Sequence, residues 1–508
     1  MKKGFTLIEL LAVILILGII ALIAIPTVNN ILKESRRGAF QSTLTNIVKA
    51  AEEKCTTEQI KNQEITETYV IEGGVVSPSL DIKGELPDGA IYVNQNCEVS
   101  FILSNNNFIG KKEYAGEIVI TEGSFTNYVY TETVLNGTDP VIPNNLVPVT
   151  IEDDGTVKKA DIKTKWYSYA EKKWANAVML TDSGKVEDDG IIKEESIESY
   201  FVWIPRYKYK LFDMGNYDTQ NTGSATENKA KPIEIIFENK DTEVSVGTNV
   251  GDYHSHPAFQ AFNTNGLWVG KFETSGTMTD LKIKPNQKSI IRQTVKAMFD
   301  ASLGYSNTNK SHLMKNTEWG AVAYLSHSIY GIKEEININN HSGMMTGYSA
   351  VDKLRFGDND EFTLPYNTTT GYKASTTGNI TGVYDMSGGA YEYMAAYIDG
   401  KYGASGFSSN PKDIYGQEYF DVYNAATSLT TDYKYRILGD ATGEMGPFYQ
   451  SSSTSSWYLD ISSFFHKNLP WIQRGGYYII GSSAGSFSFA NNSGGAMEFT
   501  GFRIILAE

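Results

Sequence analysis

An apolar run near the N-terminus constrains the fold of this chain more than any other feature. Residues 10–25 are all apolar except Gly18, and no later segment is comparable. A helix over residues 5–25 would be about 31 Å long at 1.5 Å per residue, which matches the roughly 30 Å of a bilayer core. The run therefore predicts a membrane-spanning helix at about residues 5–25 rather than part of a globular core.

A secretory signal peptide is the first alternative, because Lys2 and Lys3 form a basic head before the run. Against it, no small-residue cleavage site closes the run, Glu9 lies at its start, and helical periodicity continues beyond it. A carboxylate within a membrane costs about 2 to 3 kcal/mol unless it is paired. Glu9 therefore needs a cation, either a nearby lysine or the α-amino group that cleavage after Gly4 would create on Phe5.

The string KGFTLIE at residues 3–9 resembles the processing site of type IV prepilins and of the pseudopilins of type II secretion and DNA-uptake machines. The resemblance implies that a prepilin peptidase removes residues 1–4 by cutting after Gly4 and methylates the amine of Phe5. It also implies that Glu9 neutralises the amine of an adjacent pilin subunit during assembly. The expected location is the cell membrane, crossed once, and then an extracellular pilus or the cell surface.

Helical periodicity continues past the apolar run. Apolar residues recur at i, i+3 and i+4 spacing, which is typical of one face of a helix, at Val28, Ile31, Leu32, Ala39, Phe40, Leu44, Ile47, Val48 and Ala51. The pattern predicts one helix over residues 5–54. Its outer half is expected to bury this stripe against a small domain, while its inner half packs with other helices or with lipid.

The chain has two cysteines, Cys55 and Cys97. Turn signals around 87–89 and 105–107 flank alternating apolar residues, so residues 55–113 are expected to form a small antiparallel pilin-like head. A disulfide between Cys55 and Cys97 would stabilise this head by roughly 4 kcal/mol, because it closes a long loop. Two separate buried thiols remain the alternative, since spacing alone constrains pairing weakly.

Residues 114–145 are rich in Thr, Asn, Gly and Pro and are expected to form a linker. Residues 146–508 then provide far more chain than a pilin head requires. With 44 Lys and Arg against 59 Asp and Glu, the net charge is −15, which argues against a nucleic-acid partner. The phosphate-binding string GxxxxGK and the zinc-binding string HExxH do not occur.

Six segments of this C-terminal region resemble, in the same order, the formylglycine-generating (sulfatase-modifying factor) family, whose fold is a variant of the C-type lectin fold. They are FVWIP at 201–205, GLWVGKFETS at 266–275, TEWGAVAY at 317–324, GVYDMSGGAYEY at 382–393, RGGYY at 474–478 and GFR at 501–503. The fold class implied is α+β: a long membrane and stalk helix, a small antiparallel β head, and a large loop-rich domain at 146–508.

Four of the charged residues within these segments are expected to form a structural network, because buried charges usually occur in pairs; they are Asp385, Glu392, Arg474 and Arg503. Enzymes of the family use a pair of C-terminal cysteines, and none follows Cys97 here. A metal site at His254 and His256 is less expected than surface histidines beside Pro257, because no third ligand has a suitable spacing. No catalytic residue and no cofactor are expected, with Ca²⁺ kept open.

Aromatic, Ser, Gly and Asn residues crowd residues 450–493 while charges are few, a composition that recurs at recognition surfaces. In lectin-type folds of this group, the part between RGG and GFR often carries the ligand face. The candidate ligand-binding residues are Trp457, Trp471, Tyr477, Tyr478, Phe487, Asn491 and Asn492. An aromatic core under polar loops is the alternative.

Together these features predict a type IV pilin-like surface protein, a minor or tip subunit whose C-terminal domain binds an extracellular glycan or protein in adhesion. Its expected partners are a prepilin peptidase, other pilin subunits and the membrane. A pseudopilin of type II secretion or DNA uptake is one alternative. A membrane-tethered metalloenzyme of the sulfatase-modifying-factor family is the other.

Overall fold

The structure is a computed structural model. It describes residues 7–507 apart from 62–66, 73, 83, 94–96, 106, 113–115, 124–136, 165, 211–232, 241–253, 307, 352–362, 425–436, 443–453 and 456. Most side chains before residue 28 also lie outside the described part. The chain divides into two compact units, which are considered separately: an N-terminal unit of one helix with a small sheet, and a larger C-terminal unit.

The N-terminal unit consists of the long helix α1 (Leu7–Ile60) and a six-stranded antiparallel sheet. The strand order is β2-β1-β3-β4-β5-β6. The bounds are β1 Glu67–Glu72, β2 Val75–Ser77, β3 Asp88–Val93, β4 Val99–Ser104, β5 Phe108–Lys112 and β6 Val119–Glu122. The helix runs beyond the predicted end at residue 54, so Cys55 lies within it, and β6 lies inside the predicted linker.

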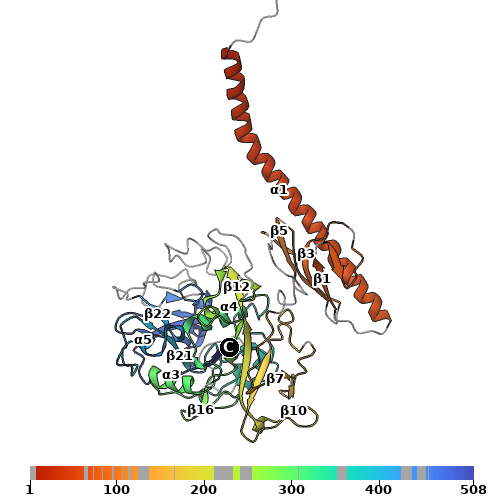
Figure 1. Cartoon of the computed structure of the whole chain (residues 1–508). Coiled ribbons are helices and arrows are strands. Elements are labelled where there is room, and N and C mark those ends of the chain that lie inside the picture. The colour runs from red at the N-terminus through yellow and green to blue at the C-terminus, as the bar shows by residue number, and fades with distance from the viewer. Residues whose placement is uncertain are drawn as a thin grey trace, which may run out of the picture. The chain divides into compact units, whose positions relative to one another are not determined.

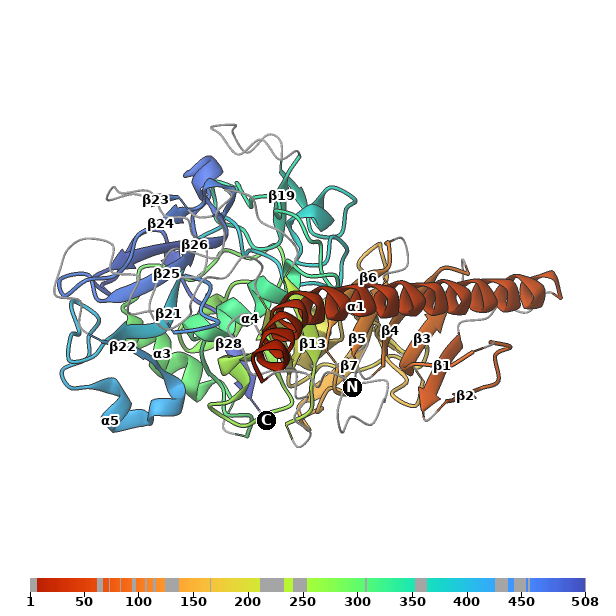
Figure 2. The ribbon, with the colours of Figure 1, turned by 90° about the horizontal axis from the view of Figure 1, so that it is seen from above.

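The C-terminal half of α1 packs against one face of this sheet, while the N-terminal half projects past it (Figures 1 and 2). Part of the predicted stripe enters the core, namely Phe40, Leu44, Ile47, Val48 and Ala51, and Cys55 joins it. The prediction was wrong for Val28, Ile31, Leu32 and Ala39, which are exposed, the first three because α1 extends past the sheet there. A side chain at Gly110 on β5 would place its Cβ 2.3 Å from Leu44, so this glycine allows the helix to approach the sheet closely.

The C-terminal unit is a mixed α+β structure with many strands and few helices. Its largest sheet has the order β10-β8-β7-β9-β11-β15-β28-β18. The bounds are β7 Leu146–Ile151, β8 Val157–Lys159, β9 Asn176–Leu180, β10 Ile191–Ile192, β11 Ile197–Pro205, β15 Gly266–Gly270, β18 His312–Leu313 and β28 Ile504–Ala507. The last strand of the chain thus lies between two strands that precede it by about 200 residues.

A second sheet has the order β22-β21-β25-β26-β24-β23, with β27 paired to β21. The bounds are β21 Tyr391–Ile398, β22 Asp421–Tyr423, β23 Thr454–Ser455, β24 Ile461–Ser462, β25 Trp471–Gly475, β26 Gly485–Asn492 and β27 Thr500–Gly501. The smaller sheets are formed by β12 Tyr207–Lys210, β13 Glu234–Phe237 and β14 His254–Ser255, by β16 Ser275–Thr277 and β17 Asp280–Lys282, and by β19 Tyr348–Ala350 and β20 Thr363–Pro365. The helices are α3 Val295–Gly304, α4 Asn316–Ser326 and α5 Pro411–Tyr415.

Buried tryptophans attach irregular segments to these sheets. The indole N–H of Trp268 donates to the carbonyl of Val141 (2.7 Å), and that of Trp203 donates to Thr138 (3.2 Å). Residues 138 and 141 therefore belong to the C-terminal unit, although the sequence placed them in a linker. Each of these hydrogen bonds pairs a loop carbonyl that has no partner strand. The tryptophans therefore attach these loops to the core.

Candidate functional site

The two halves of α1 differ in what their apolar side chains contact. In the C-terminal half, Leu44, Ile47 and Ala51 are fully buried against the sheet. In the N-terminal half, every large apolar side chain that the structure describes is exposed: Leu11, Leu15, Ile16, Val28, Ile31 and Leu32, with exposed fractions of 48% to 65%. Exposed large apolar side chains grouped on one helix are typical of a site of association with protein or lipid.

The processing residues Gly4 and Phe5 lie outside the described residues. Glu9 lies on α1, but its side chain is not among those described, so its predicted ion pair has no geometry here. The predicted span at 5–25 also falls mostly on such side chains. Among the described residues, no helix meets the length and apolarity needed to cross a membrane.

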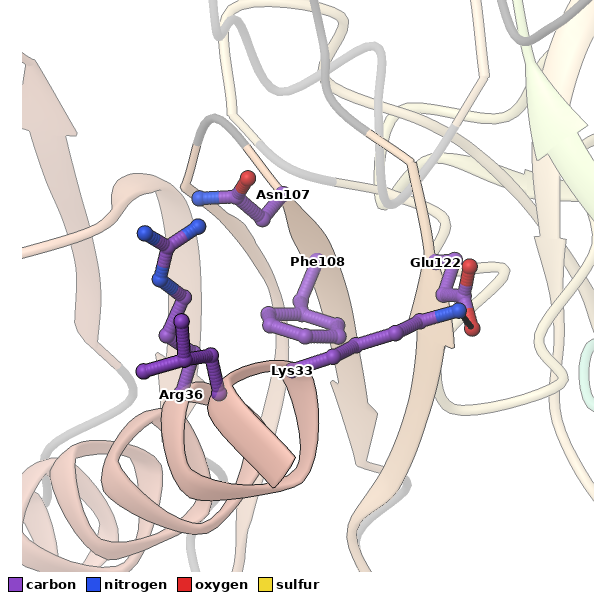
Figure 3. Close-up of a pocket in the computed structure, with 6 residues that line it drawn as sticks. Lys33, Arg36, Asn107, Phe108 and Glu122 are labelled. Atoms are coloured by element: carbon purple, nitrogen blue, oxygen red, sulfur yellow. Dashed lines mark ion pairs between the residues drawn. The ribbon is translucent and has the colours of Figure 1, made fainter. Parts of the chain in front are cut away.

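Where α1 leaves the sheet it carries three cations. The ammonium of Lys33 pairs with the carboxylate of Glu122 on β6 at 2.5 Å, and Arg37 donates to the carbonyl of Ile120 at 3.2 Å. Between them in the sequence, Arg36 borders a cavity of 340 Å³ (Figure 3). It also borders an adjoining cavity of 640 Å³. These contacts fix the angle at which the helix leaves the head, and the cavities form a groove at that edge.

Cys55 and Cys97 form a disulfide, with a Cα–Cα distance of 5.5 Å, which confirms the predicted pairing. Cys55 is on α1, and Cys97 lies in the connection between β3 and β4. The bridge closes a loop of 42 residues that contains β1, β2 and β3. The disulfide therefore ties α1 to the connection between β3 and β4. It stabilises the packing of the helix on the sheet, as the apolar core does.

Three of the seven candidate ligand-binding residues are buried, which corrects the prediction for them. Trp457, Trp471 and Phe487 have exposed fractions of 0% or 1% and pack inside the second sheet of the C-terminal unit. Trp471, for example, stacks on Tyr397 at 5.1 Å and donates its indole N–H to Tyr402. These rings are core because they fill the sheet interior, and a ligand cannot reach them in this conformation.

The two candidate asparagines are partly exposed but serve internal hydrogen bonds. The amide of Asn491 donates to the carbonyl of Phe464 at 2.7 Å. The side-chain oxygen of Asn492 accepts from the hydroxyl of Tyr393 at 2.6 Å and from the backbone of Gly494. Asn491 therefore joins β26 to the segment after β24, and Asn492 shapes the turn after β26, which limits the availability of both side chains to a ligand.

Tyr477 and Tyr478 are partly exposed and belong to a surface cluster, here called the aromatic patch. The ring of Tyr477 stacks on Phe499 at 4.9 Å and contacts Tyr391 at 5.2 Å. Ile479, Met497 and Phe499 remain 60%, 42% and 38% exposed. Sequence reasoning missed Tyr391 and Phe499, because they are 86 and 22 residues from Tyr477 and no local pattern joins them.

The predicted structural residues are fully buried, as expected of a polar network. Arg503 makes a two-point ion pair with Glu392 (2.5 and 3.0 Å) and also donates to the carbonyls of Gly270 and Tyr384. Asp385 accepts from the amide of Asn339 and the backbone of Gly347, both at 2.9 Å. This network joins segments that are more than 100 residues apart.

Arg474 differs from Arg503, because no carboxylate in the described residues pairs with it. It donates to the carbonyls of Ala441 and Ser486 and lies between the rings of Trp319 and Phe489, each at 5.6 Å. Burial lowers the pKa of Arg474 to about 10. Its role in the structure is therefore to join loops to β25 through carbonyl and ring contacts.

A third buried carboxylate belongs to the same region. Glu273 accepts from the backbone of Ala390 at 2.9 Å and bonds the hydroxyl of Ser289. Burial, followed by repulsion from Asp385 and Glu392, raises its pKa well above the usual range. Since one arginine faces three carboxylates, this environment favours the protonated form of Glu273.

The two candidate metal ligands share a face, since both rings contact Tyr209, at 6.4 Å for His254 and 5.2 Å for His256. His256 is fully buried rather than at the surface, and burial lowers its pKa to about 3. In the part of the chain that the structure describes, no three His, Cys, Asp or Glu side chains are grouped to hold a metal ion.

Residues 481–485, GSSAG, fit the GxSxG pattern of α/β-hydrolases. In those enzymes the serine follows a strand and precedes a helix. Here Ser483 ends the short helix η8 (Gly481–Ser483) and precedes β26, so the string does not form that turn.

Comparison with known proteins assigns the N-terminal region. Residues 1–25 match the family described as the prokaryotic N-terminal methylation motif, which includes the leader and the first turns of α1. No curated protein matches the chain. The match supports a type IV pilin-like or pseudopilin-like protein that is a substrate for prepilin processing, and it concerns this N-terminal region alone.

Proposed function

We propose that this protein is a minor or tip subunit of a type IV pilus, which displays its large C-terminal domain at the cell surface for adhesion. The observation that carries the proposal is the division of α1. A methylation motif precedes an apolar half whose described large side chains are exposed, and the other half is fixed to a disulfide-tied head. Such a helix can pack with neighbouring subunits while its head stays outside.

The proposed assembly begins in the membrane, with residues 5–25 as its single span. Prepilin peptidase cuts after Gly4 and methylates Phe5, and Glu9 then pairs with the amine of the adjacent subunit. The exposed side chains from Leu11 to Leu32 supply the apolar contact area between helices. A minor or tip position follows from size, because a domain of about 360 residues on every subunit would crowd a helical filament.

For the C-terminal domain we propose a formylglycine-generating-enzyme-like, C-type-lectin-type fold that binds a ligand without catalysis. The support is that residues from its motif segments meet in one buried network, which includes Glu273, Glu392 and Arg503. The enzymatic cysteines of the family are missing after Cys97. The aromatic patch is the favoured ligand face, since it combines exposed apolar area with tyrosine hydroxyls.

Assembly is tested first by processing. The chain is expressed with a prepilin peptidase and the mature N-terminus is measured by mass spectrometry. We expect loss of residues 1–4 and one methyl group on Phe5. Glu9→Ala should insert into the membrane but fail to enter filaments, with Glu34→Ala on the same helix as the matched control. Normal incorporation of Glu9→Ala would contradict the pairing argument.

The position in the filament is tested by labelling purified pili with an antibody to residues 146–508. Label at tips or at rare sites supports a minor subunit, and label along the whole filament contradicts it. The pseudopilin alternative predicts instead that deletion of the gene abolishes secretion or DNA uptake. Metal analysis of the purified chain tests the enzyme alternative, because a stoichiometric transition metal would favour it.

Adhesion is tested with a glycan and matrix-protein screen using the full-length chain in detergent. Tyr477→Ala and Phe499→Ala should each weaken binding several-fold, because they remove half of a stacked pair of about 1 kcal/mol or more. Tyr415→Ala, a partly exposed tyrosine on α5, is the matched control. Equal binding by all variants would remove the aromatic patch as the ligand face.

A further inference from the structure

A groove at the edge of the head is lined by cationic, amide and apolar side chains that have no role in the proposed filament assembly. It consists of the two adjoining cavities, which share Arg36 and Asn107. We name it the helix–sheet groove; it is lined by Leu32, Lys33, Arg36, Ala39, Phe40 and Thr43 of α1 and by residues of the 84–88 and 104–108 segments with Glu122. Its floor is apolar, because Phe40 and Phe108 are buried there and stack at 6.0 Å.

Two polar side chains face this groove without an internal partner. Lys33 is neutralised by Glu122 at 2.5 Å. Arg36 and the side-chain amide of Asn107 make no hydrogen bond or ion pair within the described chain. Figure 3 shows both polar groups on the same side of Phe108, while Lys33 extends the other way toward Glu122. The groove thus offers a guanidinium fork and an amide N–H beside apolar surface.

The position of the groove along α1 indicates what it meets. Leu32 is the last exposed large apolar residue of the helix's N-terminal half, and Arg36 is one turn further, about 6 Å along the axis. Helical side chains tilt toward the N-terminus, and arginine extends its charge toward water while its stem stays on apolar surface. The exposed apolar side chains thus continue about 10 Å past the proposed span at residues 5–25, into the headgroup layer, and the Arg36 side chain leans back toward that layer.

We propose that the helix–sheet groove binds the headgroup of an anionic phospholipid of the membrane in which the subunit resides before assembly. The phosphodiester accepts from Arg36 and Asn107, and the glycerol lies against Leu32 and Phe108. Arginine suits this task because its planar fork matches a phosphate in two-point fashion. A chain of net charge −15 needs such a local cation to rest on an anionic surface. The inference rests on the membrane stage of the proposed function.

The test is native mass spectrometry of the full-length chain, released from detergent with equal amounts of phosphatidylglycerol and phosphatidylcholine. The wild-type protein should retain phosphatidylglycerol in preference to phosphatidylcholine. Arg36→Gln should reduce the phosphatidylglycerol adduct roughly five-fold, and Asn107→Ala should reduce it less. Both residues are exposed, so neither change is expected to unfold the head.

Lys49→Gln is the matched control, because Lys49 is an exposed cation on the same helix about 20 Å further along. Equal adducts for Arg36→Gln and Lys49→Gln, or equal retention of the two lipids by the wild type, would overturn the proposal. So would full displacement of the lipid by free glycerol phosphate at the same concentration. Failure of the pilin function is distinguishable, because it would appear as an unprocessed N-terminus in a chain that still retains the lipid.

Discussion

The two units of the molecule are stabilised in different ways. In the N-terminal unit, one helical stripe from Phe40 to Cys55 meets one sheet face, and a single disulfide ties the two. In the C-terminal unit, many strands are short. Hydrogen bonds and ion pairs of buried charges, indole N–H groups and carbonyls join segments that are distant in the sequence. Local periodicity therefore suffices for a small helix-on-sheet unit, whereas a loop-rich domain depends on individual long-range polar contacts.

The largest expected effect is in the C-terminal unit. Arg503→Met should lower its free energy of unfolding by about 3 to 5 kcal/mol, because it leaves Glu392 buried without its partner. Urea unfolding followed by tryptophan fluorescence measures the change. Arg292→Met is the control, since its ion pair with Glu498 is exposed and should be worth less than about 1 kcal/mol. Equal effects would show that the network does not hold the domain.

Removal of the disulfide should act on the other unit. The double change Cys55→Ser and Cys97→Ser should destabilise the helix and head by about 2 to 4 kcal/mol, because it frees a 42-residue loop in the unfolded state. Calorimetry of the full-length chain in detergent should show a lower transition for this unit and an unmoved transition for the C-terminal unit. A shift of both transitions would show that the two units do not unfold independently of each other.

The two halves of α1 give a sharper version of the comparison. Leu44→Ala should cost about 2 to 4 kcal/mol, because Leu44 is fully buried over Gly110 and its loss leaves a cavity. Leu32→Ala on the same helix should change the stability of the head by less than about 0.5 kcal/mol, since Leu32 is exposed. Filament assembly should respond in the opposite order, because the exposed half supplies the proposed intersubunit contact.

The smallest expected effect concerns pH. The pKa of Glu273 is raised in the folded state by burial and by the neighbouring carboxylates, so this group binds its proton more tightly when folded. Its contribution to stability is complete below the unfolded pKa near 4.5 and is lost as pH rises toward the folded value, with a slope of at most about 1.4 kcal/mol per unit. Glu273→Gln should therefore flatten the decline in stability as the pH rises above about 5.

The experiment measures the free energy of unfolding of the wild type and of Glu273→Gln at each pH. Lys271 is also fully buried, which lowers its pKa, and its contribution has the opposite sign, since stability rises with pH while the unfolded lysine alone is protonated. The contribution of Lys271 is the same in the wild type and in Glu273→Gln. The difference in stability between the two proteins therefore reports on Glu273 alone. Parallel pH profiles would contradict a protonated Glu273.

Much of the N-terminal unit follows from local pattern. The helical spacing predicted the buried face of α1 from Phe40 to Ala51, and the alternating apolar residues predicted the β head. The turn signal at 87–89 falls instead at the start of β3. Two boundaries differ for a physical reason. The helix continues past residue 54 because Cys55 packs in the core, and β6 extends the sheet because β5 presents a free edge to Val119 and Ile120.

The C-terminal site was predicted less well. Composition singled out residues 450–493, but it does not distinguish a ring that fills a sheet interior, such as Trp471, from one at its edge, such as Tyr477. The difference depends on strand register: β25 pairs with both β21 and β26, which encloses Trp471. Tyr477 follows β25, beyond the last paired residue, and so reaches the surface.

By itself the sequence determined the N-terminal motif, the apolar run, the amphipathic half of α1 and the lack of any cysteine after Cys97, because each is a property of neighbouring residues or of a count. Only the tertiary structure decided that Arg503 pairs with Glu392, that Tyr391 and Phe499 join Tyr477, and that Arg36 and Asn107 line the same groove. These groups lie 22 to 111 residues apart or on different elements. Helical periodicity is visible in the sequence because it relates residues three and four positions apart. Contacts between distant segments form only after the strands have paired.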